Sequence, residues 1–173
     1  MNWSLKEILP PAVLVALGLG YLLLRKRPPT LVSVLSPEGK RALVVQSALG
    51  EVGSNNTSKY WNMVAPGAII NKGTAWCGAF ALWSLKEVGL AKDWFWQFGK
   101  GFLYQLPITH SPQPGDIAYV DKPYQHHAIV HTVNPDGTVN LINGNGTDGK
   151  VSLSTQPTSH ITAFYSIEPL VNV

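Results

Sequence analysis

The sequence contains one cysteine, Cys77, in a position where a thiol could act as a nucleophile. It lies at the start of residues 76–88, where apolar side chains cover much of a helical circumference and predict a buried helix. Backbone N–H groups at a helix start stabilise a thiolate and can bind the oxyanion of an acyl-transfer reaction. A lone cysteine on an apolar helix is commonly a packing residue, so a catalytic role requires partners elsewhere in the chain.

Candidate partners for the thiol lie in the strand-rich second half of the chain. His127 begins a predicted strand, and Asn143 and Asn145 follow the next one. Neighbouring antiparallel strands would bring these side chains within about 5–8 Å of the imidazole. A thiol, an imidazole and a polar group that orients the imidazole are the parts that nucleophilic acyl chemistry requires. The set is compatible with a cysteine nucleophile, and such chemistry needs no cofactor, but packing in the core is the alternative for Cys77.

A metal site is the competing interpretation of the histidines. His127 and His131 would share one face if their segment were a helix, as zinc-binding pairs do. The β-rich context favours a strand, no convincing third ligand is visible, and one cysteine cannot build a cysteine-rich zinc site. We therefore expect no metal. Asp116 follows Pro-Gly and is interpreted as a turn residue, not a catalytic acid.

Helix signals come first along the chain and strand signals follow. Ser36, Pro37 and Glu38 form a helix start, and Tyr60 and Trp61 are expected in a short helix within the mostly irregular residues 50–74. The aromatic-rich residues 91–98 are expected to form a short helix or a wall. Short β-rich runs predict strands at residues 117–120, 128–133, 138–142, 151–153 and 161–167, with a hairpin turn at 134–137. This order predicts an α+β fold.

Three stretches, in this order, resemble the CHAP branch of the NlpC/P60-like papain superfamily. They are A-W-C-G-A-F at 75–80, P-Q-P-G-D-I at 112–117, and H-H-A-I-V at 126–130 running on to L-I-N-G-N at 141–145. The similarity covers roughly residues 37–167. It implies a papain-like domain, with N-terminal helices packed on an antiparallel sheet, that hydrolyses peptidoglycan as an amidase or an endopeptidase.

The resemblance also implies roles for single residues. Cys77 matches the nucleophile, and His127 matches the base of the H-x-I-V pattern. His126 stands where the family often has glycine, and it remains an alternative base. The third residue is Asn145, which matches the family's Gly-Asn, or Asn143, at a position often held by Glu. Some CHAP domains bind calcium through acidic residues near the cysteine, and we expect none here because this stretch has no such residues.

Several aromatic residues near the candidate site could contact the sugar rings of a glycan, because aromatic faces suit such rings. The alternative is that they pack in the hydrophobic core. The candidates are Trp76, Tyr60, Trp61 and Trp96.

The N-terminal residues predict a membrane anchor. Residues 8–24 carry no charge and are slightly short of the ~20 residues that cross a ~30 Å hydrocarbon core. Arg25, Lys26 and Arg27 follow directly and can reach the headgroups. No small-residue cleavage site follows, which favours an uncleaved anchor over a signal peptide. The predicted organisation is an anchor at 1–27, a linker at 28–36 and the hydrolase domain at 37–173.

Charge gives conflicting indications about the setting of the domain. The formal net charge of +3 is too small for a nucleic-acid binder. The basic residues after the span would place the domain on the cytoplasmic side, whereas a wall enzyme should face outward. A phage protein built into a virion membrane would reconcile the two.

The expected partners are peptidoglycan, membrane lipid, and virion or envelope proteins. The alternatives are an inactive wall-binding or structural protein and an amidase that acts on another substrate.

Overall fold

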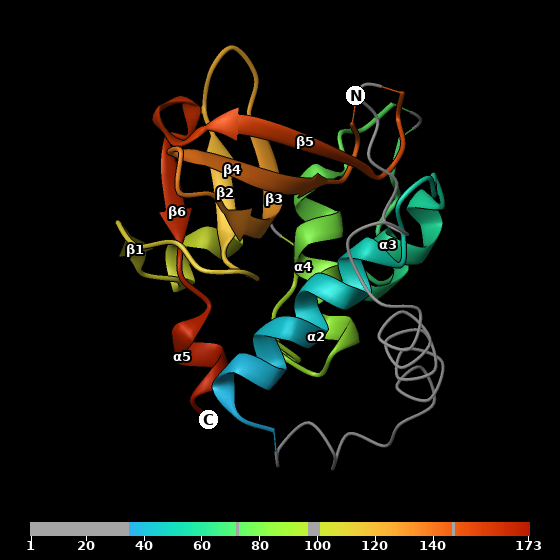
Figure 1. Cartoon of the computed structure of the whole chain (residues 1–173). Helices are drawn as coiled ribbons and strands as arrows, with labels where there is room; N and C mark the ends of the chain where they lie inside the picture. Colours follow the sequence, from blue (N-terminus) through green and yellow to red (C-terminus); the bar gives the residue numbers. More distant parts are fainter. Residues whose placement is uncertain (1–34, 72, 97–100, 147) are drawn as a thin grey trace, which may run out of the picture. The chain divides into compact units, whose positions relative to one another are not determined.

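Helices precede strands in the computed structural model, which describes residues 35–71, 73–96, 101–146 and 148–173 (Figure 1). The predicted α+β class is confirmed, and the arrangement of helices against an antiparallel sheet is compatible with a papain-like domain. The predicted anchor at 1–27, with its span at 8–24, and most of the linker lie outside the described residues. Among the residues that are described, no helix is both long and apolar enough to cross a membrane.

Three helices form where the sequence signals indicate. Helix α2 (Pro37–Leu49) begins at Ser36, whose hydroxyl accepts a hydrogen bond from the Gly39 N–H. Helix α3 (Thr57–Val64) is capped in the same way by the side chain of Asn56. Helix α4 (Cys77–Glu87) is buried along almost its whole length, which agrees with its apolar circumference. The described residues 91–96 form a bend and a turn followed by irregular chain, so no helix is formed in this part of the predicted segment.

The strands form one six-stranded antiparallel sheet in the order β1-β6-β2-β3-β4-β5. The predicted hairpin at 134–137 joins β3 to β4, and Gly137 has a φ of +82° there. The sequence did not indicate β1 or the short C-terminal helix α5 (Glu168–Val171), because each is too short for a periodic pattern. The strands are β1 (Ile108–Thr109), β2 (Ile117–Val120), β3 (His126–Val133), β4 (Thr138–Asn143), β5 (Ser152–Pro157) and β6 (Ala163–Tyr165).

The helices cover one face of the sheet. Ile117, Ile129 and Ile142 project from that face into the main core, where they pack with the apolar residues of α4. The start of α4 lies close to the end of β4, because a Cβ atom added to Gly144 would lie only 2.5 Å from the Cβ of Phe80. Glycine at 144 therefore lets the end of β4 approach the first turns of the helix that carries Cys77.

A buried ion pair joins α2 to the sheet. The Arg41 guanidinium donates to Oδ1 of Asp116 at 2.7 Å, and both side chains are nearly inaccessible, at 8% and 1% exposure. Asp116 also accepts hydrogen bonds from the backbone N–H groups of Gln113 and Ile167. These contacts agree with the structural role expected for Asp116 and connect α2, the start of β2 and the C-terminal segment.

Replacing Asp116 by Ala should destabilise the fold by about 3–5 kcal/mol, because it leaves the Arg41 charge buried without its partner. Urea unfolding followed by circular dichroism measures the change in free energy. Asp136→Ala is the control, since this carboxylate lies in an exposed turn, and its effect should be clearly smaller. A loss below about 1 kcal/mol for Asp116→Ala, typical of an exposed pair, would contradict the structural role of this ion pair.

Candidate active site

Strand β3 directs two adjacent histidines to opposite faces of the sheet. Side chains alternate along a strand, so His127 shares the helix-covered face with Ile129, and His126 shares the other face with Ala128. Cys77 begins α4 beside the start of this strand. Its thiol therefore meets imidazoles from both faces of β3.

His127 contacts the thiol from the core side. Its Nδ1 lies 3.8 Å from the Cys77 Sγ, and the side chain is only 3% exposed. The imidazole packs edge-on to Trp96, with ring centroids 5.7 Å apart, and against Tyr119 at 5.2 Å. Trp96 also covers the first turn of α4, because a Cβ at Gly78 would collide with its ring. Aromatic packing thus holds His127 in place beneath the thiol.

His126 is held by Asn143 across the β3–β4 pair. Its Nε2 lies 3.0 Å from Oδ1 of Asn143, a buried residue opposite Ala128 in the strand register. The Asn143 amide nitrogen donates to Ser154 Oγ at 3.0 Å and to the Ser152 carbonyl at 3.3 Å. This network assigns Oδ1 as the atom that accepts from the His126 Nε2–H. The other ring nitrogen, Nδ1, is then the one that can exchange a proton with the thiol.

A β-bulge decides which histidine Asn143 faces. The register of β3 and β4 shifts by one residue between Val130 and Thr132. If the pairing of Thr132 with Asn140 continued without the shift, Asn143 would lie opposite Ile129 and on the face of His127. The extra residue at His131 moves Asn143 to the face of His126.

Electrostatics at the site favour an ionised thiol. Burial raises the pKa of Cys77, but its interactions with His126 and then His127 outweigh burial and lower the pKa to about 5. Burial lowers the pKa of His126, whereas its interactions with Cys77 and Asn143 raise it further, so that it lies above its ordinary value. A thiolate and an imidazolium therefore coexist between about pH 5 and the raised pKa of His126.

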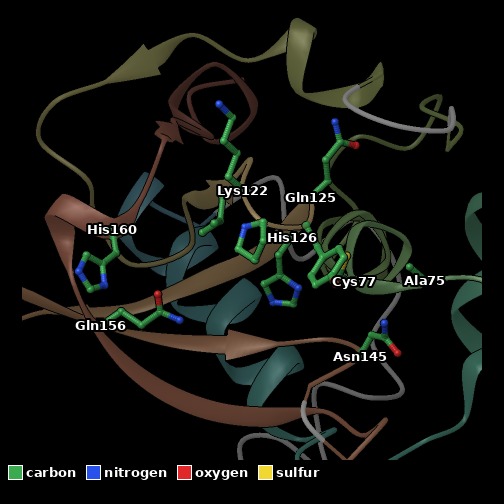
Figure 2. Close-up of a pocket in the computed structure, with 11 residues that line it drawn as sticks. Ala75, Cys77, Lys122, Gln125, His126, Asn145, Gln156 and His160 are labelled. Carbon is green, nitrogen blue, oxygen red and sulfur yellow. The ribbon is translucent and has the colours of Figure 1, made fainter.

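Three clefts meet beside the cysteine, and Asn145 lines all of them. The largest, about 850 Å³, also contains Cys77 and His126. Figure 2 shows His126 between Cys77 on one side and Gln156 and His160 on the other, with Asn145 below the cysteine. Asn145 has a left-handed backbone, with φ at +54°, which asparagine tolerates better than most residues. The candidate nucleophile therefore opens onto a surface cleft.

The four aromatic candidates occupy different environments. Tyr60 is fully buried among Trp76, Phe80 and Trp83, and its hydroxyl donates to Glu51, so it has no exposed surface for a substrate. Trp61 and Trp76 are also largely buried, but each lines a second cleft of about 340 Å³. Trp96 packs on Gly78 and His127 and lines none of the three clefts.

Several residues that line the large cleft escape the sequence analysis. Lys122, Tyr124, Gln156 and His160 line the large cleft, but they lie in a loop, a strand edge and a short 3₁₀ turn that carry no motif. Within the described ranges, no cluster of three or more His, Cys, Asp or Glu side chains is placed to hold a metal ion. The chemistry available at the site is that of a thiolate, two imidazoles and the N–H groups of the first turn of α4.

Residues 69–145 match the family model described as the CHAP domain. The matched segment contains Cys77, both histidines, Asn143 and Asn145, and it confirms the resemblance inferred from the sequence. At the level of the family, the match supports a papain-like peptidoglycan hydrolase domain. A search among curated proteins found no match.

The rate of Cys77 alkylation by iodoacetamide should rise with a midpoint near pH 5, because the thiolate is the reactive form. An ordinary thiol has its midpoint near pH 8.5, roughly three units higher. Alkylation is assigned without ambiguity by mass spectrometry, since the chain has one cysteine.

His126→Ala should move this midpoint upward, because it removes the hydrogen bond that contributes most to lowering the thiol pKa. His110→Ala, at an exposed position outside the clefts, is the matched control and should leave the midpoint unchanged. A native midpoint near pH 8.5 would contradict the ionised pair.

Proposed function

We propose that this chain, whose residues 69–145 match the CHAP domain model, is a peptidoglycan hydrolase that cleaves an amide bond through a cysteine nucleophile. The observation that carries the proposal is the thiol of Cys77, with its pKa lowered to about 5, beside two imidazoles at a surface cleft. A thiol that only packed in the core would have its pKa raised by burial. The reaction class is acyl transfer to water, by an amidase or an endopeptidase.

The proposed reaction has two stages. The Cys77 thiolate attacks the amide carbonyl carbon, and first-turn N–H groups of α4 stabilise the oxyanion that forms. The imidazolium then gives its proton to the leaving amine as the C–N bond breaks, which leaves a thioester on Cys77. Water, deprotonated by the now neutral imidazole, attacks the thioester carbon. The C–S bond breaks, a carboxylic acid leaves, and the thiolate and imidazolium are restored.

We assign the proton transfer to His126, not to His127. The hydrogen bond from Nε2 to Asn143 supports this choice, since it fixes the ring and leaves Nδ1 for the thiol and the leaving group. His126 also lines the cleft, whereas the structure packs His127 between Trp96 and Tyr119 on the core side. The family pattern favours His127, and its Nδ1 lies 3.8 Å from the sulfur, so His127 remains the alternative base.

Asn143 and Asn145 take separate roles in this proposal. Asn143 orients His126, and its buried amide is engaged by Ser152 and Ser154. Asn145 lines all three clefts and is only partly buried, which supports a role for its amide as a hydrogen-bond partner of the substrate beside the cysteine. Asn143 is therefore a positioning residue, and Asn145 is a candidate substrate contact.

Incubation of the full chain with purified peptidoglycan should release soluble fragments, whose masses identify the bond that is cut. Cys77→Ala should release none, because it removes the nucleophile. If neither protein releases fragments from several wall types while both bind the wall, the inactive wall-binding alternative replaces the enzyme. Hydrolysis of other amides without any wall fragment would favour an amidase that acts on another substrate.

His126→Ala should lower kcat by about 10²–10⁴-fold, the usual contribution of a general acid–base group. His127→Leu is the matched variant, because it removes the second imidazole but preserves apolar packing against Trp96 and Tyr119. It should reduce kcat much less. Equal circular dichroism spectra and urea midpoints would exclude misfolding as the cause. A large loss with His127→Leu and a small one with His126→Ala would transfer the role of base to His127.

Membrane attachment is a separate proposal that rests on the apolar residues 8–24 and the basic residues after them. Attachment would hold the domain near a bilayer, in a cell envelope or a virion membrane. Protease shaving of intact cells or virions tests the orientation: cleavage of the domain from outside supports an outward-facing enzyme, and protection until lysis supports the cytoplasmic side.

A further inference from the structure

The part of the large cleft beyond His126 forms an arm lined by Lys122, Gln156 and His160, which are basic or hydrogen-bonding side chains. Lys122 lies on its rim, and Gln156 and His160 lie together on the far side of His126 from Cys77 (Figure 2). Tyr124 adds an aromatic side chain that is 83% exposed. These residues come from the loop after β2, from β5 and from the 3₁₀ turn Thr158–His160, so the sheet topology brings together three segments distant in sequence.

In the described part of the chain, no acidic side chain lines the cleft to neutralise this arm. Among the described residues that line the three clefts, none is Asp or Glu. The nearby Asp121 carboxylate accepts a hydrogen bond from the Tyr119 hydroxyl at 2.7 Å. Within the described part of the chain, the Lys122 ammonium makes no hydrogen bond or ion pair with protein. A positive charge without a protein counter-ion at a cleft rim raises the local concentration of anionic ligands.

We propose that this arm is a subsite for a carboxylate of the substrate's peptide, with Lys122 as the main charge partner and Gln156 and His160 as hydrogen-bond donors. The proposal rests on the proposed function for the identity of the peptide, a peptidoglycan stem. A carboxylate needs one cation and a few N–H donors, which these three side chains supply. The second cleft, lined by neutral side chains such as Asn62, Asn71 and Thr57, offers no such charge. The two sides of the cysteine therefore select different parts of the substrate.

Binding, not hydrolysis, gives the sharpest test. The full chain with Cys77→Ala keeps the ligand intact, and fluorescence anisotropy measures Kd for a labelled stem tetrapeptide whose two carboxylates are amidated one at a time. One of the amidated peptides should bind about fivefold more weakly than the free acid, the most that an exposed ion pair usually provides. That peptide identifies the carboxylate that is bound.

Charge variants then assign the effect to Lys122. Lys122→Met should abolish the difference between the acid and the amide, and Lys122→Glu should make the amide the better ligand. Lys92→Glu is the matched control, an exposed lysine outside the clefts, and it should leave the difference intact. Equal Kd values for the acid and both amides, no binding of any peptide, or an unchanged preference after Lys122→Glu would each overturn the subsite.

Hydrolysis of the same peptides by the native chain separates this proposal from the proposed function. Discrimination in binding without any cleavage would contradict the enzyme and leave the subsite standing. Cleavage at equal kcat/KM for the acid and both amides would contradict the subsite and leave the enzyme standing.

Discussion

A one-residue bulge in β3 is the constraint on which the arrangement of the candidate site depends. Side chains alternate along a strand, so a shift of one residue reverses the face that a partner strand presents. The bulge at His131 places Asn143 opposite Ala128, on the face of His126. Without it, Asn143 would face the side of His127, and no amide would hold the imidazole that lines the cleft. The bulge therefore separates one histidine bonded to an amide from another packed among aromatic rings.

The rest of the domain brings the thiol to that strand. The glycine at 144 allows α4 to approach the end of β4, and Trp96 covers the first turn of the helix beside Gly78. The buried Arg41–Asp116 pair fixes α2 against the start of β2, the neighbour of β3 in the sheet. Tight packing makes these contacts mutually dependent, since interiors leave few voids into which a neighbour could relax. The low pKa of Cys77 is then a consequence of position, because burial alone would raise it.

Local signals in the sequence predict the parts of this site but not their pairing. Caps at Ser36 and apolar periodicity predict α2 and α4, and the turn at 134–137 predicts the β3–β4 hairpin. The bulge leaves no comparable signal, so the sequence alone could not say which histidine Asn143 faces. The sequence does not predict Lys122 and His160 for a related reason: they line one cleft because β6, a strand distant in sequence, pairs with β2. The sequence leaves core packing and substrate contact open for Tyr60, because aromatic residues suit both a core and a groove, and the structure buries it fully.

A crystal structure of the full chain with a stem-peptide aldehyde bound at Cys77 tests the central claim most directly. The aldehyde carbon forms a reversible bond with the sulfur, and its oxygen takes the place of the oxyanion. The account predicts that this oxygen lies against the first-turn N–H groups of α4. It also predicts that Nδ1 of His126 lies within hydrogen-bond distance of the sulfur or oxygen bound to the aldehyde carbon. Nε2 of His126 should still donate to Asn143. An adduct whose polar atoms are bonded to His127, with His126 turned away from the sulfur, would contradict it.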